Sequence, residues 1–438
     1  MSPVATHPLL LASASEQARA VLSGHISAED LLQLQLQAID HWQPALNSYI
    51  ARTPATTPEK GFSLLAGSSF AAKDNFDVAG LPSASGLRAL SRMPTRDATV
   101  VARLRAAGLS CLGKLNMHPM ALGASNHNPD FGNCFNPVGA SLTPGGSSGG
   151  SGAAVAAGLC GIALGSDTMG SVRIPAAYCG VVGFKPSHET LGLDGIDTLC
   201  RWLDHVGLLA RSVEDITAAM LITAPQLPPA HSPVARRWRV GVVQDLPALG
   251  ASEAVCLAFG TAIGQLQQSL PMDVVPLHLA ASQLGASRRA GLLLCEAELH
   301  HRLVPLLRDR PDALPTDLLN MMHYIERKSA LDLGQALAQV ARTGEQLDTL
   351  LRGLDAVLMP TAPQVAFAMD MPPPPNQADF TAMANMNGAP AISLPLPVAP
   401  GALPVGLQAV GQRGHDLALL QLAVLLEHAL KPTPTRSP

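Results

Sequence analysis

The chain has 438 residues, of which 47% are hydrophobic and only 3% aromatic, so it can bury a large core of aliphatic side chains. Its formal net charge of −4 gives no reason to expect nucleic acid or a lipid surface as a partner. No stretch approaches the roughly 20 consecutive apolar residues of a membrane span, so a membrane-spanning protein is not expected either.

Helix and strand signals alternate along the chain. Ser27, three residues before Asp30, predicts the start of a helix that continues to about His41. The alternation that follows predicts a sheet covered by helices. The other expected elements are helices over 97–107, 152–157 and from 213 onward, and strands over 109–115, 160–164, 239–243 and 355–359.

Glycines crowd around serines in the segment TPGGSSGGSGAAVAAG, residues 143–158. A second turn with a serine, GSDTMGSVRIP, follows at 165–175. Glycine at this density admits positive φ and lets backbone N–H groups face a ligand. Serines held in such segments indicate nucleophilic chemistry.

Other uses of a glycine loop fit the neighbouring residues less well. A phosphate-binding loop ends in lysine and a hydroxyl residue, whereas this loop continues into Ser151, Gly152 and Ala153. A dinucleotide site and a nucleophile elbow both need a strand directly before the loop, and Pro144 opposes one. A Ser-His-Asp arrangement that uses a downstream histidine stays open as the rival. The histidines considered for it are His188 and His205.

Lys73 is the candidate base. The chain has only six lysines, and this one follows the apolar run Phe70–Ala72. A desolvated lysine can lose its proton near neutral pH, whereas an arginine in a protein cannot.

Three motifs, in this order, resemble the amidase signature family. They are AAKDNFDVAGLP, GGSSGGSGAAVAAG and GSDTMGSVRIPAAYCGVVGFKPS, and similarity continues through DATVVARLRAAGLSCLGKLNM and NGAPAISLPLPV. The resemblance implies an α/β fold in one domain over 1–438, with a central mixed β-sheet covered by α-helices on both faces. We expect its core signature region at about 60–225. A variable helical region is expected at about 251–354, beyond the proline-rich stretch 225–235.

By the same resemblance, Ser171 is the nucleophile, Ser147 is the serine that follows a cis peptide bond, and Lys73 is the base. Ser147 would pass the proton of Ser171 to neutral Lys73 and later return one to the leaving amine. No metal and no cofactor are implied. Oxyanion donors or substrate contacts are expected from Thr168, Met169, Gly170, Ala121 and Gly123, and structural support from Ser148, Asp167 and Arg173.

Met169 departs from the commonest family pattern, which has glycine at this position. We expect its side chain to narrow the acyl pocket or make it more apolar. Asp167 and Arg173 are expected to pair and hold the Ser171 turn. The acidic and histidine residues between Glu296 and His301 lack the HExxH spacing of a zinc site, so we expect them on a solvated helix face.

The predicted function is that of an amidase acting on a small neutral or aryl amide, because the residues expected to line the pocket, 120–123, 126–128 and Met169, carry no charge. One alternative is the glutamine-hydrolysing A-type subunit of a tRNA-dependent amidotransferase. The stretch DFTAMANMNGAPAIS supports it, and Ile174, where those subunits usually have glutamine, opposes it. A biuret- or allophanate-type urea amidase is a further possibility. A catalytically inactive scaffold is opposed by the intact Ser and Lys residues.

The expected partner is a small-molecule amide, with neither nucleic acid nor a membrane bound directly. Family members often form dimers, so a homodimer is a further expectation. The seven cysteines are odd in number and widely spaced, without a CxxC pair, which is typical of free thiols in a reducing compartment. The N-terminal segment lacks the basic start of a secretion signal. We therefore expect a cytoplasmic protein.

Overall fold

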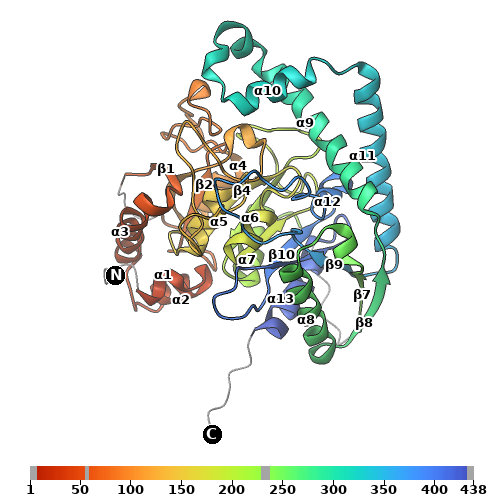
Figure 1. Ribbon diagram of the computed structural model, residues 1–438. Coiled ribbons are helices and arrows are strands. Elements are labelled where there is room, and N and C mark those ends of the chain that lie inside the picture. The colour runs from red at the N-terminus through yellow and green to blue at the C-terminus, as the bar shows by residue number, and fades with distance from the viewer. Residues whose placement is uncertain (1–6, 55–58, 228–236, 432–438) are drawn as a thin grey trace.

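An eleven-stranded mixed β-sheet forms the centre of the computed structural model, which describes residues 7–54, 59–227 and 237–431 (Figure 1). The start of the chain and most of the proline-rich stretch 225–235 lie outside the described residues. Strand β2 is parallel to β3 and β4, and β7 is parallel to β8 and β9, whereas the other neighbours are antiparallel. The order is β1 (Tyr49–Arg52), β3 (Ser110–Leu115), β2 (Ser69–Lys73), β4 (Ile162–Asp167), β6 (His205–Ala210), β5 (Val182–Lys185), β10 (Ala391–Pro395), β11 (Gly406–Val410), β9 (Ala356–Pro360), β7 (Trp238–Val243), β8 (Met272–Leu277).

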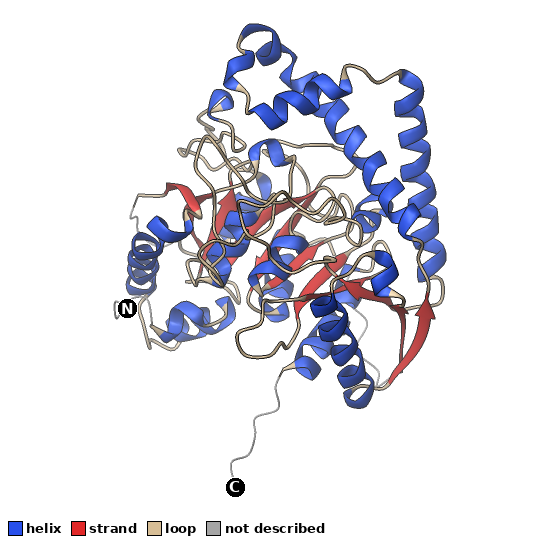
Figure 2. Cartoon of the chain, viewed as in Figure 1, coloured by secondary structure: helices blue, strands red, loops and turns tan. Residues whose placement is uncertain are grey.

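Helices surround this sheet (Figure 2), which confirms the predicted α/β class. The long helices α9 and α11 pack against each other to one side of it, at the top and right of Figure 1, and α10, which follows α9 in the chain, lies at the top. None of the described helices is long and apolar enough to cross a bilayer. The α-helices are α1 (Pro8–Leu11), α2 (Ala14–Leu22), α3 (Ala28–Leu46), α4 (Thr99–Ala106), α5 (Gly149–Ala156), α6 (Arg173–Cys179), α7 (Val213–Thr223), α8 (Glu253–Ser269), α9 (Ala281–Asp309), α10 (Thr316–Ile325), α11 (Ala330–Leu351), α12 (Ala382–Asn387) and α13 (Asp416–Leu430).

Two apolar cores form on the two faces of the sheet. In β2, Phe70 and Ala72 belong to the larger core, together with residues of α7 and α13. Ala71 belongs to the other core, which includes residues of α5 and α6. Because side chains alternate along a strand, Lys73 points to the same side as Ala71, toward the glycine loop that leads into α5.

The predicted elements are present, with shifted ends. The Ser27 hydroxyl accepts from the Asp30 N–H and begins α3 as expected. This helix continues beyond His41 to Leu46, where Asn47 adopts the left-handed conformation and ends it. The strand predicted over 160–164 is β4, which runs instead to Asp167. Region 251–354 is mostly helical, but it also contains β8, which pairs with β7 at the edge of the sheet.

Candidate active site

Lys73 is the last residue of β2, and its side chain is fully buried. Its Nζ lies 2.7 Å from Ser147 Oγ and 2.8 Å from Ser166 Oγ. Burial lowers the pKa of this lysine to about 7, although the carboxylates of Asp204 and Asp167 oppose the shift. An amine with this pKa is partly neutral at physiological pH and can accept a proton.

The glycine loop brings Ser147 to Lys73. The Gly146–Ser147 peptide bond is cis, as the family resemblance implies. The His118 N–H donates to the Ser147 carbonyl at 3.1 Å, which anchors the loop to the segment after β3. A Cβ at Gly150 would lie only 2.4 Å from the Asn116 carbonyl oxygen, so this close approach requires glycine.

The turn that carries Ser171 lies against the same loop. The Ser148 N–H donates to the Ser171 carbonyl at 3.2 Å, and the Ser148 hydroxyl donates to the Ser166 carbonyl, also at 3.2 Å. The Ser171 side chain is partly exposed, and its hydroxyl has no hydrogen-bond partner within the described part of the chain. Three segments that the sequence singled out therefore meet where β2 and β4 end.

A buried ion pair supports this turn. Asp167 and Arg173 are both fully buried, with Arg173 Nη2 at 2.8 Å from Asp167 Oδ1. Burial alone would raise the pKa of Asp167, but Arg173 holds it below its usual range. The Asp167 carboxylate also accepts from the Gly170 and Val172 N–H groups at 2.7 and 3.1 Å, on either side of Ser171. The pair thus fixes the backbone conformation around Ser171.

The same hydrogen bonds correct one expectation. Gly170 was an expected oxyanion donor, but its N–H is already bound to Asp167. In the residues that the structure describes, the N–H groups of Thr168, Met169 and Ser171 have no such acceptor. Gly170 is instead required for space, because its φ is +128° and a Cβ would lie 2.2 Å from Thr381 Oγ1.

The Met169 side chain turns toward α9. A Cβ at Gly291 would lie 2.7 Å from its Sδ. Met169 packs on an apolar cluster that includes Met120, Ala121 and Leu203. Ala121, expected as a pocket residue, is therefore part of the apolar packing beside the Ser171 turn.

A cavity of about 700 Å³ opens beside the glycine loop, and we call it the loop cavity. Gly123 lines it, as expected, together with Ala124. A Cβ at Gly146 would lie 2.8 Å from the Ala124 carbonyl carbon, so the cavity wall packs directly on the loop that carries Ser147. Pro372 and Pro373, from the proline-rich segment before α12, also line the cavity.

The acidic and histidine side chains expected on a solvated face of α9 do not share one environment. Glu298 accepts from the Arg201 N–H, and His300 contacts Glu326. Glu296, however, is only 4% exposed and lines the loop cavity, so the prediction was wrong for this residue. Cys295 beside it is fully buried as well. Whether this face of α9 is buried depends on how the helix packs against the rest of the protein, which the residue types alone do not show.

The rival histidine arrangement is not formed. His205 Nδ1 lies 2.7 Å from the Leu203 carbonyl oxygen, and its ring packs edge-on against that of His188. Among the described residues, no histidine ring hydrogen-bonds to Ser147 or Ser171.

Three polar residues of the site were not found from the sequence. Ser166 bonds Lys73, and Asp204 accepts from Thr168 Oγ1 at 2.5 Å. Asn385 donates to Asp167 and accepts from Arg173. Ser166 lies inside the third motif and Asn385 inside the stretch DFTAMANMNGAPAIS, so motif membership was the available signal for these two.

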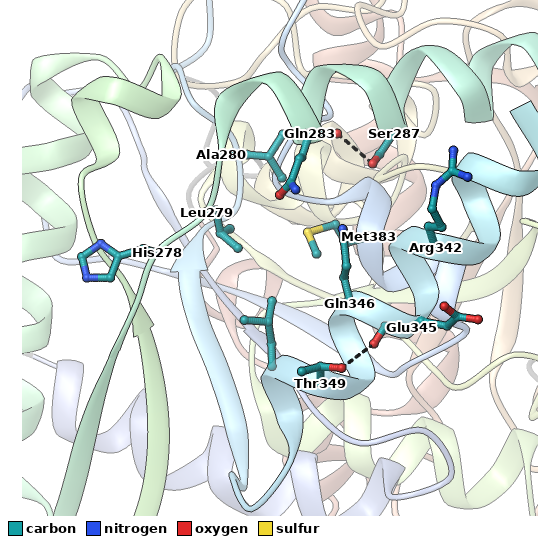
Figure 3. A pocket seen from close by; sticks show the side chains of 12 residues that line it. His278, Leu279, Ala280, Gln283, Ser287, Arg342, Glu345, Gln346, Thr349 and Met383 are labelled. Carbon is teal, nitrogen blue, oxygen red and sulfur yellow. Dashed lines mark hydrogen bonds between the residues drawn. The ribbon is translucent and has the colours of Figure 1, made fainter. Parts of the chain in front are cut away.

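A second cavity, of about 490 Å³, lies between α9 and α11 beside α12 (Figure 3). Its wall includes Ser287, Arg342 and Glu345, with Met383 between the two long helices. It shares no lining residue with the loop cavity and contains none of the predicted site residues.

Known proteins resemble this chain over nearly its whole length. A family model described as Amidase matches residues 31–420. The A-type subunit of glutamyl-tRNA(Gln) amidotransferase from Anaeromyxobacter sp. (strain K) is 33% identical, with 96% of each chain covered. The crystal structure of an amidase superposes with a TM-score of 0.88 at 30% identity, covering 96% of this chain and 100% of that one. A peptide amidase from Stenotrophomonas maltophilia gives 0.83 at 25% identity, covering 97% and 98%.

Proposed function

This chain belongs to the amidase signature family, and on that premise we propose that it hydrolyses a carboxylic amide through an acyl-enzyme on Ser171. The observation that carries the proposal is the 2.7 Å contact between buried Lys73 Nζ and Ser147 Oγ, in a loop bonded to the Ser171 turn. The lowered pKa of Lys73 supports its role as the base.

In the proposed reaction, Ser171 Oγ attacks the amide carbon while its proton passes to Ser147 and from Ser147 to neutral Lys73. The backbone N–H groups of Thr168, Met169 and Ser171 stabilise the oxyanion. The relay then runs in reverse, protonating the nitrogen as the C–N bond breaks. A water molecule, deprotonated by the same relay, attacks the acyl carbon and releases the acid.

The part of the acyl group next to the carbonyl carbon is proposed to be uncharged. Met169 and the apolar cluster that includes Met120 and Leu203 lie beside the Ser171 turn, and they favour an aliphatic or aryl group there. Small urea-type amides are also uncharged, so they remain a second candidate substrate class.

Hydrolysis of glutamine for a partner enzyme is the other candidate function, since a relative with 96% coverage is an A-type amidotransferase subunit. One observation weighs against it. Free glutamine carries an α-carboxylate, and no lysine or arginine is among the described residues that line the loop cavity or the adjoining cavity at His118 and Pro119. We therefore place a freestanding amidase first.

The location and assembly of the protein stay predictions. All seven cysteines are free thiols, and six of them are buried, which favours a reducing compartment such as the cytoplasm. A homodimer is checked by light scattering of the purified protein.

The test is labelling with a fluorophosphonate probe, followed by intact-mass measurement of wild type, Ser171→Ala and Lys73→Ala. Ammonia release from simple amides, biuret and glutamine is measured in parallel, without a partner protein. We expect Ser171→Ala to lose the label and wild type to cleave simple amides. A label that persists in Ser171→Ala contradicts the nucleophile, and ammonia from glutamine alone favours the amidotransferase function.

A further inference from the structure

Glu296 carries a buried carboxyl group that has no role in the proposed reaction. Its side chain is 4% exposed, and it makes no hydrogen bond or ion pair with any described residue. Burial raises its pKa to about 7, and Lys328, the cation that opposes this shift, stacks on the Tyr324 ring instead. The Glu296 carboxylate oxygens are not enclosed by protein atoms, so they open into the loop cavity, where water or a ligand can reach them.

The position of Glu296 connects it to the proposed chemistry. Its helix, α9, approaches Met169 of the Ser171 turn at Gly291. Glu296 follows five residues later, which is about 7.5 Å along the helix axis and about 140° around it, so it projects from a different face of α9 than Gly291. It lines the loop cavity together with Gly123 and Ala124.

The other charged groups of the loop cavity have the same sign. Asp317 and Asp370 line it together with Glu296. His118 also lines the cavity, and burial lowers its pKa to about 3, so its ring is neutral. Lys328 acts on Glu296 from outside the lining, and no lysine or arginine is among the described residues of the lining itself. The cavity therefore attracts a cation and repels a carboxylate.

We propose that Glu296 binds a protonated amine at the far end of the substrate, so that the enzyme prefers amides whose aliphatic chain ends in an ammonium group. The inference rests on the proposed amide hydrolysis and names its substrate class. The acyl carbon lies at Ser171, the methylene chain runs along the apolar cluster at Met169, and the ammonium group donates hydrogen bonds to the Glu296 carboxylate.

The test compares matched amides that differ only in the terminal group. We pair 6-aminohexanamide with heptanamide and 4-aminobutanamide with pentanamide, and measure kcat/KM for each. Wild type is expected to prefer at least one amino amide by about tenfold or more over its neutral partner, which corresponds to about 1.4 kcal/mol. In Glu296→Gln this preference falls about tenfold, while kcat/KM for the neutral amides stays within about twofold.

The control is Glu345→Gln, which removes an exposed carboxylate from α11 outside the loop cavity and is expected to keep the wild-type preference. Equal kcat/KM values for each pair in wild type overturn the proposal. An equal loss for both amides in Glu296→Gln also overturns it, because that result indicates a structural role only.

A binding measurement separates this inference from the proposed function. Calorimetry with hexylammonium chloride is carried out on Ser171→Ala and on Ser171→Ala combined with Glu296→Gln. Binding that weakens about tenfold or more in the double variant supports the ammonium site even if wild type cleaves no amide. Equal binding, or none, overturns the site whether or not amide hydrolysis is observed.

Discussion

One titratable side chain is buried where β2 and β4 end, and another is buried on helix α9. The two differ in their hydrogen-bond partners. Lys73 is hydrogen-bonded to Ser147 and to both the hydroxyl and the carbonyl of Ser166. Glu296 has no partner among the described residues and faces a cavity. The first group is already positioned before a substrate binds, whereas the second is proposed to gain its partner from one. In the proposed function, the sheet and its loops carry the reaction, and the helical region contributes to the choice of substrate.

The strongest test of this contrast is Lys73→Met. Removing the base is expected to lower kcat about 10³-fold, because positioned proton transfer contributes on the order of 10² to 10⁴. The fold should persist, since Lys73 is in no ion pair with any described residue and its replacement by an apolar chain of similar length leaves no charge unpaired. Steady-state kinetics and a melting curve measure both effects. Lys431→Met, at an exposed position, is the control; a kcat of Lys73→Met within tenfold of wild type contradicts the assignment.

The next largest effect is expected from Asp167→Ala. It leaves the Arg173 charge buried and unpaired, and the loss in free energy of unfolding should be about 3 to 5 kcal/mol. Urea denaturation measures it. The matched control is Asp273→Ala, whose ion pair with Arg237 is exposed and should contribute less than about 1 kcal/mol. Similar losses in both variants would show that the buried Asp167–Arg173 pair contributes no more to the free energy of unfolding than an exposed ion pair does.

The pH profile gives a smaller effect. Only neutral Lys73 can accept the proton, and its pKa is about 7, so kcat/KM should rise about tenfold between pH 6 and pH 8 and level off above. The Asp204 carboxylate raises the Lys73 pKa, so Asp204→Asn should move the acid limb to lower pH. An acid limb that is absent, or that moves to higher pH in Asp204→Asn, contradicts this role of Lys73.

The smallest change is expected in the helical region. In Gly291→Ala, the new methyl group would meet only the flexible ends of Met169 and Met386, which can move aside. The free energy of unfolding should change by less than about 1 kcal/mol. The KM for amides should change severalfold at nearly constant kcat, since the acyl pocket changes and the relay does not. A fall in kcat without a change in KM would show that α9 supports the reaction itself.

Local sequence patterns located most elements of the fold. The Ser27 cap predicted the start of α3, and the helix expected from 213 and the strand expected over 239–243 match the starts of α7 and β7 to within one residue. The order of the strands was not predicted, because pairing joins segments far apart in the chain. Strand β8 was missed as well, since it lies at the sheet edge and only part of its surface is buried.

For the candidate site, the sequence by itself determined which residues to consider: Lys73, Ser147 and Ser171 stand in three motifs whose order and residue types indicate a proton relay to a serine. Only the tertiary structure decided what surrounds them. The Arg173 partner Asn385 lies 212 residues further along the chain, and the burial of Glu296 depends on how α9 packs against the rest of the protein. Contacts between distant segments decide how deeply a titratable group is buried and whether it has a hydrogen-bond partner, and these two factors set its pKa. Local spacing in the sequence reveals neither the burial nor the partner.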